Sequence, residues 1–353
     1  MDLQNAVALT LLRGISRPRA AAAFKALTEQ STAVALEEVI AACGADARAD
    51  ALAREARDEA ALLLERAHAA GIAVMRCEDE TYPPLLRAIG DPPPVLWVRG
   101  AIEALTRPAV AIVGSRAATP YALEVAARLA RELAARQVVV VSGLARGVDG
   151  AAHRGCVEAG GRTLAVLGSG PDVIYPREHE SLAARLCQDG AIVSELGPGA
   201  PPLPEHFPLR NRLISGISLG VVVVEASEKS GSLITARCAL EQGRDVMAVP
   251  GSILGGRNRG SHALLKDGAK VVETADDILE ELGWPGLGES VKIFSNPLIQ
   301  DELLSKLTPG ESYDLDELSA TVEMDASKLL PRLTEWELLG RLVKVAGGRY
   351  KLA

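Results

Sequence analysis

The chain has 353 residues and a formal net charge of −8, from 38 basic and 46 acidic side chains. A single hydrophobic core rarely grows past roughly 250–300 residues, so this length predicts two or three domains. Apolar residues make up 48% of the chain and charged residues 24%, which is a globular composition and excludes an intrinsically disordered protein.

Residues 1–69 are rich in Ala, Leu and Glu and contain no strand-like run, which predicts a domain made only of helices. Gly14 is placed to end one helix and Pro18 to open the next, because glycine is common just after a helix and proline at its start. A small bundle of the helix-hairpin-helix or SAM-like kind fits this pattern. A packing appendage without a ligand of its own fits it equally well.

From about residue 70 to residue 285, short apolar strands alternate with helical segments. The predicted strands are 72–76, 95–98, 109–113, 138–141, 163–167, 221–224, 246–249 and 270–272. The predicted helices between them are 122–136, 148–159, 178–187, 209–218, 233–242 and 275–282. Short continuous runs of Val, Ile and Leu are typical of strands buried on both faces. The alternation predicts an α/β fold with a doubly wound parallel sheet.

A Trp-Pro-Gly-Leu-Gly stretch at 284–288 reads as a linker, and residues 291–353 follow it. They predict helices at 297–307, 315–321 and 326–340 and strands at 341–345 and 349–352, with a Gly-Gly turn between the strands. Three helices and a hairpin in this order are typical of a winged helix-turn-helix domain. The longest helix carries two glutamates against one lysine and one arginine, so a protein contact is at least as good an interpretation as a DNA groove.

The five cysteines are scattered and contain no CxxC pair, which argues against a disulfide framework and a zinc knuckle and favours a reducing compartment. No apolar run approaches the roughly 18–20 residues of a membrane helix. The N-terminus lacks the basic region of a signal peptide. We therefore expect a cytoplasmic protein that does not enter a membrane.

The net charge argues against broad attraction to nucleic acid, because none of the three regions is basic overall. Residues 70–285 nevertheless contain 19 arginines and 3 lysines against 25 acidic residues. Arginine binds phosphate through its planar, forked guanidinium. A polyanion would therefore bind at a local cluster of arginines.

Ligands of a parallel sheet bind outside the carboxyl ends of its strands, and here those ends are rich in Gly, Ser and Arg. Glycine lets the backbone approach a ligand closely, and helix N-termini offer free N–H groups to phosphate. Several such loops on one edge favour a phosphate-binding cleft over turns that are glycine-rich for steric reasons alone. The candidate binding residues of these loops are Gly114, Ser115, Arg116, Ser142, Gly143, Arg146, Gly168, Ser169, Gly231 and Ser232.

The segment 207–212, Phe-Pro-Leu-Arg-Asn-Arg, predicts a helix start with two arginines near its positive end. Arg210 and Arg212 are two residues apart and cannot share one helix face, so one can reach the cleft while the other binds a carboxylate. Glu195 and Glu205 are the candidate partners for such an internal salt bridge. Phe207 is either a core side chain or a stacking platform, which would contribute ~1–3 kcal/mol per base. The candidate binding residues of this segment are Phe207, Arg210, Asn211 and Arg212.

Three enzyme motifs are approached but not met. Gly168-Ser169-Gly170 begins like a nicotinamide fingerprint, but Pro171 follows and the third glycine is missing. Residues 251–258 imitate a Walker A loop but end in Arg-Asn. Residues 216–220 match the sequence pattern of a hydrolase nucleophile elbow, yet they follow a predicted helix and precede a strand.

No histidine pair has metal-ligand spacing, and His153 is better explained as a structural residue than as a phosphate contact. The sequence therefore indicates no catalytic residue, metal site or cofactor.

Taken together, these blocks resemble the DNA-processing protein A family (DprA, also called Smf) over most of residues 80–270. The blocks that carry the resemblance are Tyr82-Pro83, Asp91-Pro92-Pro93, Ile112–Arg116, Ser142–Asp149 with Ala152-His153, Phe207–Gly216, Ser230–Ala236 and Ala248–Gly251. Glu205-His206 stands before Phe207, where members of the family often have a basic residue. Residues 255–260 also differ from the commoner form but keep Arg257 and Arg259.

The resemblance implies an extended Rossmann-like domain that binds single-stranded DNA without hydrolysing it. In the family, the loop that matches 114–116 and the segment that matches 207–212 contact DNA phosphates and bases. The resemblance also implies a homodimer that protects incoming DNA and loads the recombinase RecA during natural transformation. A helical N-terminal domain and a C-terminal winged helix are common additions, so we expect a division into 1–69, 70–285 and 291–353.

The alternative is an enzyme, a Rossmann-like nucleotide N-glycosidase of the phosphoribohydrolase type. Such enzymes carry G-G-x-G-T-x-x-E, in which the glutamate assists cleavage of the glycosidic bond. The comparable loop here has Thr235 where that glutamate would fall, and neither Glu225 nor Glu241 has the required spacing. We therefore expect a non-enzymatic protein that binds single-stranded DNA.

Overall fold

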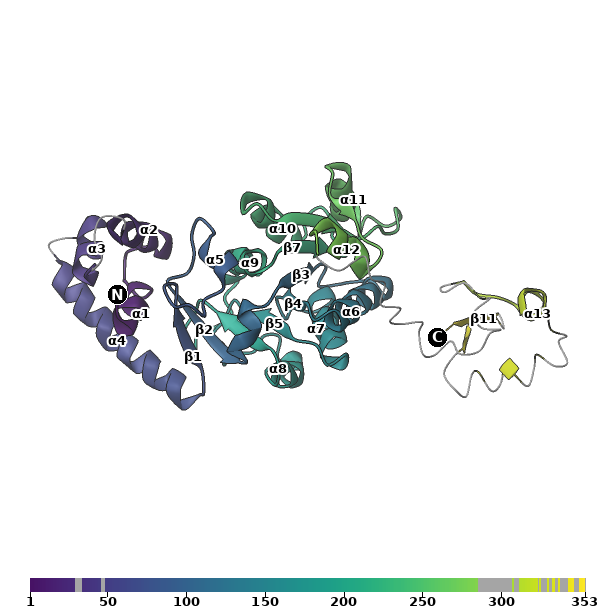
Figure 1. Cartoon of the computed structure of the whole chain (residues 1–353), viewed down its shortest axis with the longest axis horizontal. Coiled ribbons are helices and arrows are strands. Elements are labelled where there is room, and N and C mark those ends of the chain that lie inside the picture. The colour runs from purple at the N-terminus through teal and green to yellow at the C-terminus, as the bar shows by residue number, and fades with distance from the viewer. Residues whose placement is uncertain are drawn as a thin grey trace. The chain divides into compact units, whose positions relative to one another are not determined.

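The computed structural model describes residues 1–28, 34–45 and 48–284 and, in the C-terminal region, 307, 311–322, 324, 329, 332–333, 336, 342–345 and 349–352. Residues 1–287 form one compact unit and residues 288–353 a second one (Figure 1).

A nine-stranded sheet lies at the centre of the first unit, in the order β1-β2-β6-β5-β4-β3-β7-β8-β9. The strands are β1 (Ala73–Arg76), β2 (Val95–Gly100), β3 (Ala109–Val113), β4 (Val139–Ser142), β5 (Thr163–Val166), β6 (Ala191–Ser194), β7 (Gly220–Val223), β8 (Asp245–Ala248) and β9 (Lys270–Val271). All neighbouring pairs from β6 to β9 are parallel. The predicted α/β fold with a doubly wound sheet is confirmed. The sheet is not wholly parallel, because β2 runs antiparallel to both β1 and β6.

Strand β6 was not among the predicted strands. Its sequence, Ala-Ile-Val-Ser, is only four residues long and has two strongly apolar side chains, so no periodic pattern marks it. The strand is nevertheless fully buried between β5 and β2. Helices α5 (Pro84–Arg87) and α11 (Arg259–Lys266) were missed for the same reason, because one or two turns of helix give too short a pattern.

Helices cover both faces of the sheet, which makes a three-layer α/β/α unit (Figure 1). The helices on one face are α6 (Pro120–Ala135), α7 (Val148–Glu158), α8 (Glu180–Leu186) and α12 (Ala275–Glu281). The helices on the other face are α5, α9 (His206–Ile217) and α10 (Ser232–Glu241). In β3, Val110 and Ile112 point to the first layer and Ala111 and Val113 to the second. Because both faces are buried, the strand is apolar at every position.

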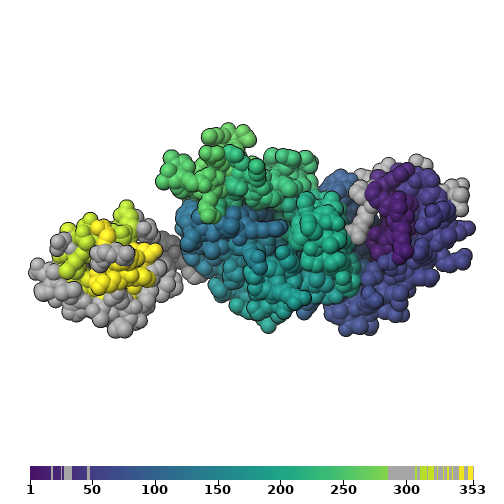
Figure 2. All heavy atoms as spheres, turned by 180° about the vertical axis from the view of Figure 1, so that it is seen from behind, coloured from purple at the N-terminus to yellow at the C-terminus, as the bar shows by residue number. Residues whose placement is uncertain are grey.

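The N-terminal region consists of helices α1 (Leu3–Leu9), α2 (Arg17–Thr28), α3 (Leu36–Ala42) and α4 (Ala49–Ala69). Gly14 has a φ of +77°, as expected for a glycine that ends a helix. The apolar cluster of these helices includes Ile72, Val95 and Trp97 from the antiparallel end of the sheet, and Trp97 is fully buried there. Figure 2 shows the purple and indigo N-terminal region lying directly against the blue and teal part of the same unit. The helices are therefore a covering layer for β1 and β2.

In the second unit, α13 (Leu315–Val322) and the antiparallel hairpin of β10 (Leu342–Val345) and β11 (Arg349–Leu352) share an apolar cluster that contains Trp336. The predicted helices at 297–307 and 326–340 fall largely outside the described residues. The winged helix and the three-domain division thus stay predictions. In the described part of the chain, no helix is both long and apolar enough to cross a membrane.

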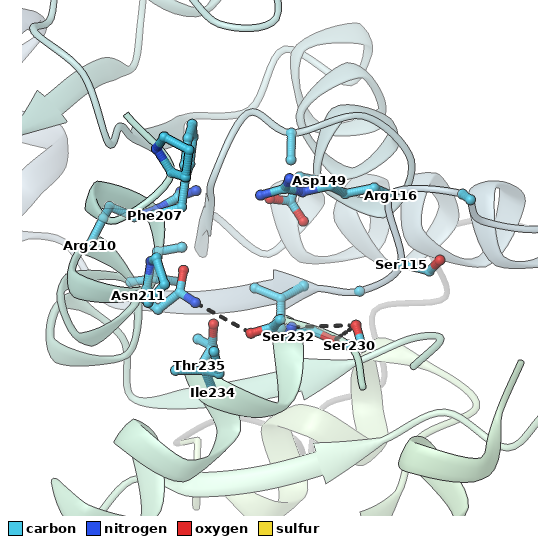
Figure 3. Close-up of a pocket in the computed structure, with 18 of the residues that line it drawn as sticks. Ser115, Arg116, Asp149, Phe207, Arg210, Asn211, Ser230, Ser232, Ile234 and Thr235 are labelled. Carbon is cyan, nitrogen blue, oxygen red and sulfur yellow. Dashed lines mark hydrogen bonds between the residues drawn. The ribbon is translucent and has the colours of Figure 1, made fainter. Parts of the chain in front are cut away.

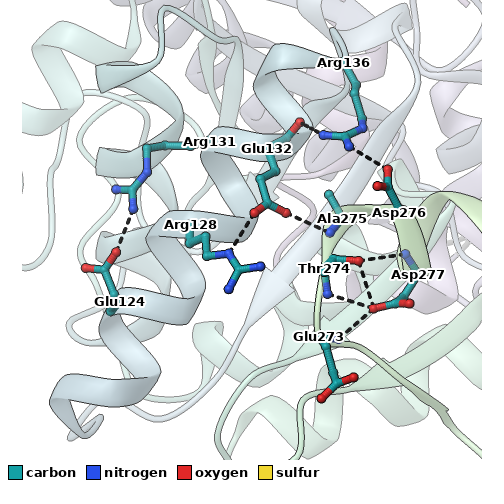
Figure 4. A network of polar contacts seen from close by, with 10 residues as sticks. All are labelled: Glu124, Arg128, Arg131, Glu132, Arg136, Glu273, Thr274, Ala275, Asp276 and Asp277. Carbon is teal, nitrogen blue, oxygen red and sulfur yellow. Dashed lines mark hydrogen bonds and ion pairs between the residues drawn. The ribbon is translucent and has the colours of Figure 1, made fainter. Parts of the chain in front are cut away.

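A network of charged groups fastens α12 to α6 (Figure 4). The Glu132 carboxylate on α6 accepts hydrogen bonds from Arg128 Nε at 2.8 Å and from the backbone N–H of Ala275, the first residue of α12, at 3.0 Å. Arg136 donates to the Glu132 carbonyl at 2.9 Å and to the Asp276 carboxylate at 2.6 Å. Glu132 thus supplies a negative charge and an acceptor to the N-terminus of α12, where N–H groups lack partners within the helix.

Glu132→Ala is expected to lower the free energy of unfolding by about 1–2 kcal/mol, because it leaves a helix N-terminus without its charged acceptor. Glu124→Ala is the matched control, since Glu124 is 71% exposed and pairs only with Arg131, so its loss should change stability by less than about 0.5 kcal/mol. Urea denaturation of both variants checks the difference. Equal effects would show that the contact with Ala275 does not stabilise the fold.

Candidate nucleic-acid interface

A cavity of about 610 Å³ opens at the carboxyl ends of β3 and β7 (Figure 3). The chain leaves β3 towards α6 on one face of the sheet and leaves β7 towards α10 on the other face, so the loops after these two strands diverge. The cavity walls are the loop 114–117 after β3, the start of α9, and the segment 227–232 that leads into α10. The first turns of α9 and α10 therefore both face the cavity.

The loop after β3 is held in place by Glu225, which lies at the end of β7 and is 1% exposed. Its carboxylate accepts a hydrogen bond from the Thr119 hydroxyl at 2.6 Å, and its carbonyl accepts one from the Ser115 N–H at 2.7 Å. Gly147 approaches this loop so closely that a Cβ atom would lie 2.1 Å from the Ser115 carbonyl oxygen, and its φ is +75°. The loop is thus fixed at Ser115 by backbone contacts and at Thr119 by the Glu225 carboxylate.

Arg116 projects from this fixed loop into solvent. Its guanidinium carbon lies 5.3 Å from the centroid of the Phe207 ring, within the range of a cation–π contact. Phe207, the second residue of α9, is half-buried and also packs against Tyr175, with 5.7 Å between ring centroids. Phe207 is therefore part of the cavity wall, with one arginine and one tyrosine beside it.

Arg210 lies beneath the cavity and is 4% exposed. It donates to the Val166 carbonyl at 2.6 Å, whereas its Nε has no partner among the described residues. Burial lowers the pKa of Arg210 to about 10, against the opposing attraction of Asp149, and burial raises the pKa of the Asp149 carboxyl. Gly143 permits this arrangement, because a Cβ atom there would lie 2.0 Å from Arg210 Nη1. Arg210 is thus a buried cation below the site, and the exposed cation is Arg116.

Arg212 lies outside the cavity. It donates to Asp91 at 2.8 Å and to Glu195 at 2.7 Å. The alternative of an internal salt bridge with Glu195 is therefore confirmed, and Glu205 is not the partner. Both carboxylates compete with any phosphate, so this placement does not support Arg212 as a DNA-binding residue.

The cavity brings together Gly114, Ser115, Arg116, Phe207, Arg210, Asn211, Gly231 and Ser232 of the predicted residues. It leaves out Ser142, Gly143, Arg146, Gly168, Ser169 and Arg212. The Ser142 and Ser169 hydroxyls are buried and donate to the backbone carbonyls of Ile112 and Val173. Arg146 is 61% exposed and forms two hydrogen bonds of 2.8 Å with Glu178.

Sequence analysis missed several residues that line the cavity, among them Tyr175, Ser230 and Thr235. Ser230 and Thr235 lie inside residues 230–236, one of the blocks that carry the family resemblance. The Gly and Ser residues of that block could have indicated that Ser230 and Thr235 line the cavity. The Ser230 hydroxyl lies 2.8 Å from the Ser232 hydroxyl at the start of α10. Tyr175 lies in an irregular stretch without periodicity, and no sequence pattern could have placed it next to Phe207.

His153 is a structural histidine, as predicted. It is fully buried, and its Nδ1 lies 2.7 Å from the Thr163 hydroxyl, which itself donates to the Val140 carbonyl. Nδ1 must therefore carry the proton and donate. Burial lowers the pKa of His153 to about 3, so the ring is neutral in the folded protein at pH 7.

The groups around the cavity suit a phosphate next to a flat ring. Arg116 supplies an exposed charge, Asn211 supplies a side-chain amide, and Ser115 and Ser230 supply hydroxyls. Phe207 supplies an aromatic face of the kind on which bases stack. Among the residues that the structure describes, no group of three or more His, Cys, Asp or Glu side chains could hold a metal ion.

Comparison with known proteins agrees with this chemistry. Residues 73–283 match the family described as DNA recombination-mediator protein A. Protein Smf of Escherichia coli strain K12 is 42% identical over 287 residues, which cover 78% of this chain and 76% of that protein. DNA processing protein DprA of Streptococcus pneumoniae is 45% identical over 203 residues, which cover 58% of this chain and 72% of that protein.

Two solved structures share the fold. That of DNA processing protein A from Streptococcus pneumoniae aligns with a TM-score of 0.69 and 36% identity, over 80% of this chain and 99% of that one. That of DNA processing protein A from Helicobacter pylori, which is described as having a unique single-stranded DNA binding mode, aligns with a TM-score of 0.54 and 31% identity. It covers 60% of this chain and 95% of that one.

Arg210→Ala is expected to lower the free energy of unfolding by about 3 kcal/mol or more, because it leaves Asp149 as a buried charge without a cation. Arg116→Ala removes an exposed side chain and should change stability by less than about 0.5 kcal/mol. Urea denaturation measures both. Adding Asp149→Asn should recover part of the loss in Arg210→Ala, and no recovery would contradict the coupling of the two groups.

Acidification is expected to destabilise the protein through His153. The pKa of an unfolded histidine is about 6.5, so between pH 6.5 and 3 the unfolded chain binds a proton that the folded chain excludes, and stability falls as the pH falls. From pH 7 to 5 this loss is about 2 kcal/mol. His153→Gln, whose amide can still donate to Thr163, should show a shallower decline in denaturation experiments at several pH values. Identical slopes would contradict the assignment.

Proposed function

The chain belongs to the DNA recombination-mediator protein A family, and on that premise we propose that it binds single-stranded DNA at the cavity between β3 and β7. The activity is binding and not catalysis, in keeping with a family of DNA processing and recombination-mediator proteins. The observation that carries the proposal is the position of exposed Arg116 beside the Phe207 ring at the cavity wall.

The geometry favours a single strand over a duplex. A base can reach Phe207 only if it leaves its stack, because the ring lies in the wall of a hollow between two helix starts. The phosphate next to that base would meet Arg116, the Asn211 amide and the hydroxyls of Ser115 and Ser230. In a duplex the bases stay paired and stacked, so the phosphate contacts alone would remain.

We extend the proposal to recombination mediation, in which the bound strand is protected and transferred to the recombinase RecA during natural transformation. A cytoplasmic homodimer would be the binding unit. Residues 1–69, 70–285 and 291–353 would form its helical, DNA-binding and winged-helix domains. The support for this part is the family membership and the names of the relatives as DNA processing proteins.

The nucleotide N-glycosidase alternative needs a glutamate, whereas the acid that lines the cavity is Asp149, which is buried and accepts a hydrogen bond from the Gly143 N–H at 3.1 Å. Glu225 is buried beneath the loop after β3 and is engaged by Thr119 and Ser115. Glu241 ends α10, nine residues from Ser232, which at 1.5 Å per residue is roughly 13 Å from the cavity. Thr235 takes the place at which the motif needs its glutamate.

Labelled oligothymidine is expected to bind in fluorescence anisotropy with a log–log salt slope no shallower than about −0.7, because the phosphate that Arg116 neutralises contributes about −0.7. Arg116→Ala should weaken binding about tenfold and make the slope shallower by about 0.7. Arg131→Ala is the matched control, because it removes the same charge from the far half of α6, where Arg131 pairs with Glu124. Affinity independent of salt, or equal behaviour of the two variants, would contradict the proposal.

A further inference from the structure

The loop between β8 and α11 presents two adjacent apolar side chains to solvent. Ile253 is 85% exposed and Leu254 is 77% exposed, more than any other large apolar side chain among the described residues. Adjacent apolar side chains with this exposure gain nothing from burial in the fold, and contiguous exposed apolar groups are typical of interaction sites. The cavity walls do not include either residue.

The loop is held in a defined shape. Asn258 is 6% exposed and donates to the Ser252 carbonyl at 3.1 Å, and it packs so closely that a Cβ atom on Gly251 would lie 2.5 Å from it. Gly255 and Gly256 have φ values of +73° and +72°, which favour glycine and turn the chain back towards α11. The two apolar side chains therefore lie at the tip of a built turn.

The turn is continuous with the rim of the cavity. Arg257 donates to the carbonyl of Ala117, a residue of the cavity wall, at 2.7 Å. Tyr121, 55% exposed at the start of α6, donates its hydroxyl to the Pro250 carbonyl at the foot of the turn. An exposed aromatic ring and an arginine thus lie between Arg116 and the apolar tip.

The charge of this segment is opposite to that of the chain. Residues 246–266 contain three basic side chains, Arg257, Arg259 and Lys266, and no Asp or Glu, although the net charge of the whole chain is −8. Arg259 pairs with Glu228 at 3.6 Å, so Arg257 is the cation next to the cavity wall. Apolar side chains beside such a cation match a partner that combines negative charge with apolar faces. A single strand of nucleic acid has this combination, because phosphates alternate along it with unpaired bases.

We propose that Ile253 and Leu254 form a second base-contacting element for the strand that binds at the cavity. A strand with a phosphate at Arg116 continues past Ala117 and Arg257, and a base packs on the apolar tip. The inference rests on the proposed function and extends the site beyond the cavity. It assigns binding residues to a segment that carries none of the predicted contacts.

The test compares the Ile253→Ala/Leu254→Ala double variant with the unaltered protein on two probes, oligothymidine and an abasic deoxyribose-phosphate strand of equal length. Because the lost contact is to bases, the variant should bind oligothymidine about tenfold more weakly with an unchanged salt slope. On the abasic strand the two proteins should bind alike. Leu62→Ala is the matched control, since Leu62 is 57% exposed on α4 and should leave both affinities unchanged.

Any result that differs from these expectations overturns the inference. If the double variant keeps full affinity for oligothymidine, the two apolar side chains do not contact DNA, even if they contact a protein. If the variant loses affinity for both probes equally, the tip acts on the backbone path and not on bases. If the unaltered protein binds neither probe, the proposed function fails as well. Loss of binding in Arg116→Ala with full binding in the double variant would overturn this inference alone.

Discussion

The site depends on one buried carboxylate, that of Glu225. The residue lies two positions after β7, and its carboxylate and carbonyl accept hydrogen bonds from the loop that follows β3. The two strands at the switch point of the sheet are therefore linked where their chains diverge. A buried carboxylate is costly unless it is hydrogen-bonded, and Thr119 provides those bonds while capping α6. The same contact that satisfies Glu225 therefore positions Arg116.

Arg210 and Arg212, two residues apart on α9, point in different directions and bind different groups. Arg210 turns under the cavity towards Val166 and Asp149, whereas Arg212 turns away towards Asp91 and Glu195. Both guanidiniums are bound to protein groups and buried or nearly so, and the positive charge that faces the solvent at the cavity comes from Arg116. Phe207, one turn before Arg210 on the same helix, lies at the cavity wall.

The sequence was sufficient for the sheet and for the edge that carries the site, because continuous apolar runs mark buried strands and Gly-rich loops mark their ends. Strand β6 could not be predicted, because its four residues show no hydrophobic periodicity. The antiparallel direction of β2 could not be predicted either, because it depends on pairing with β6, which is distant in the chain. Periodicity also cannot distinguish an arginine that faces a cleft from one that faces a carboxylate. Ser142 and Ser169 fit the Gly-, Ser- and Arg-rich composition of a phosphate-binding loop, but their hydroxyls donate hydrogen bonds to backbone carbonyls.

The N-terminal helices reach the sheet through Val95 and Trp97, which face their apolar cluster while the neighbouring Leu96 and Val98 face the opposite layer. Residues 1–69 have the composition of an independent module, but in the folded chain they are the only cover, among the described residues, for that side of β2. Any helical replacement of this region would have to present a surface complementary to an indole, so substitutions in the helices that pack on β2 and substitutions of Trp97 are expected to affect stability non-additively.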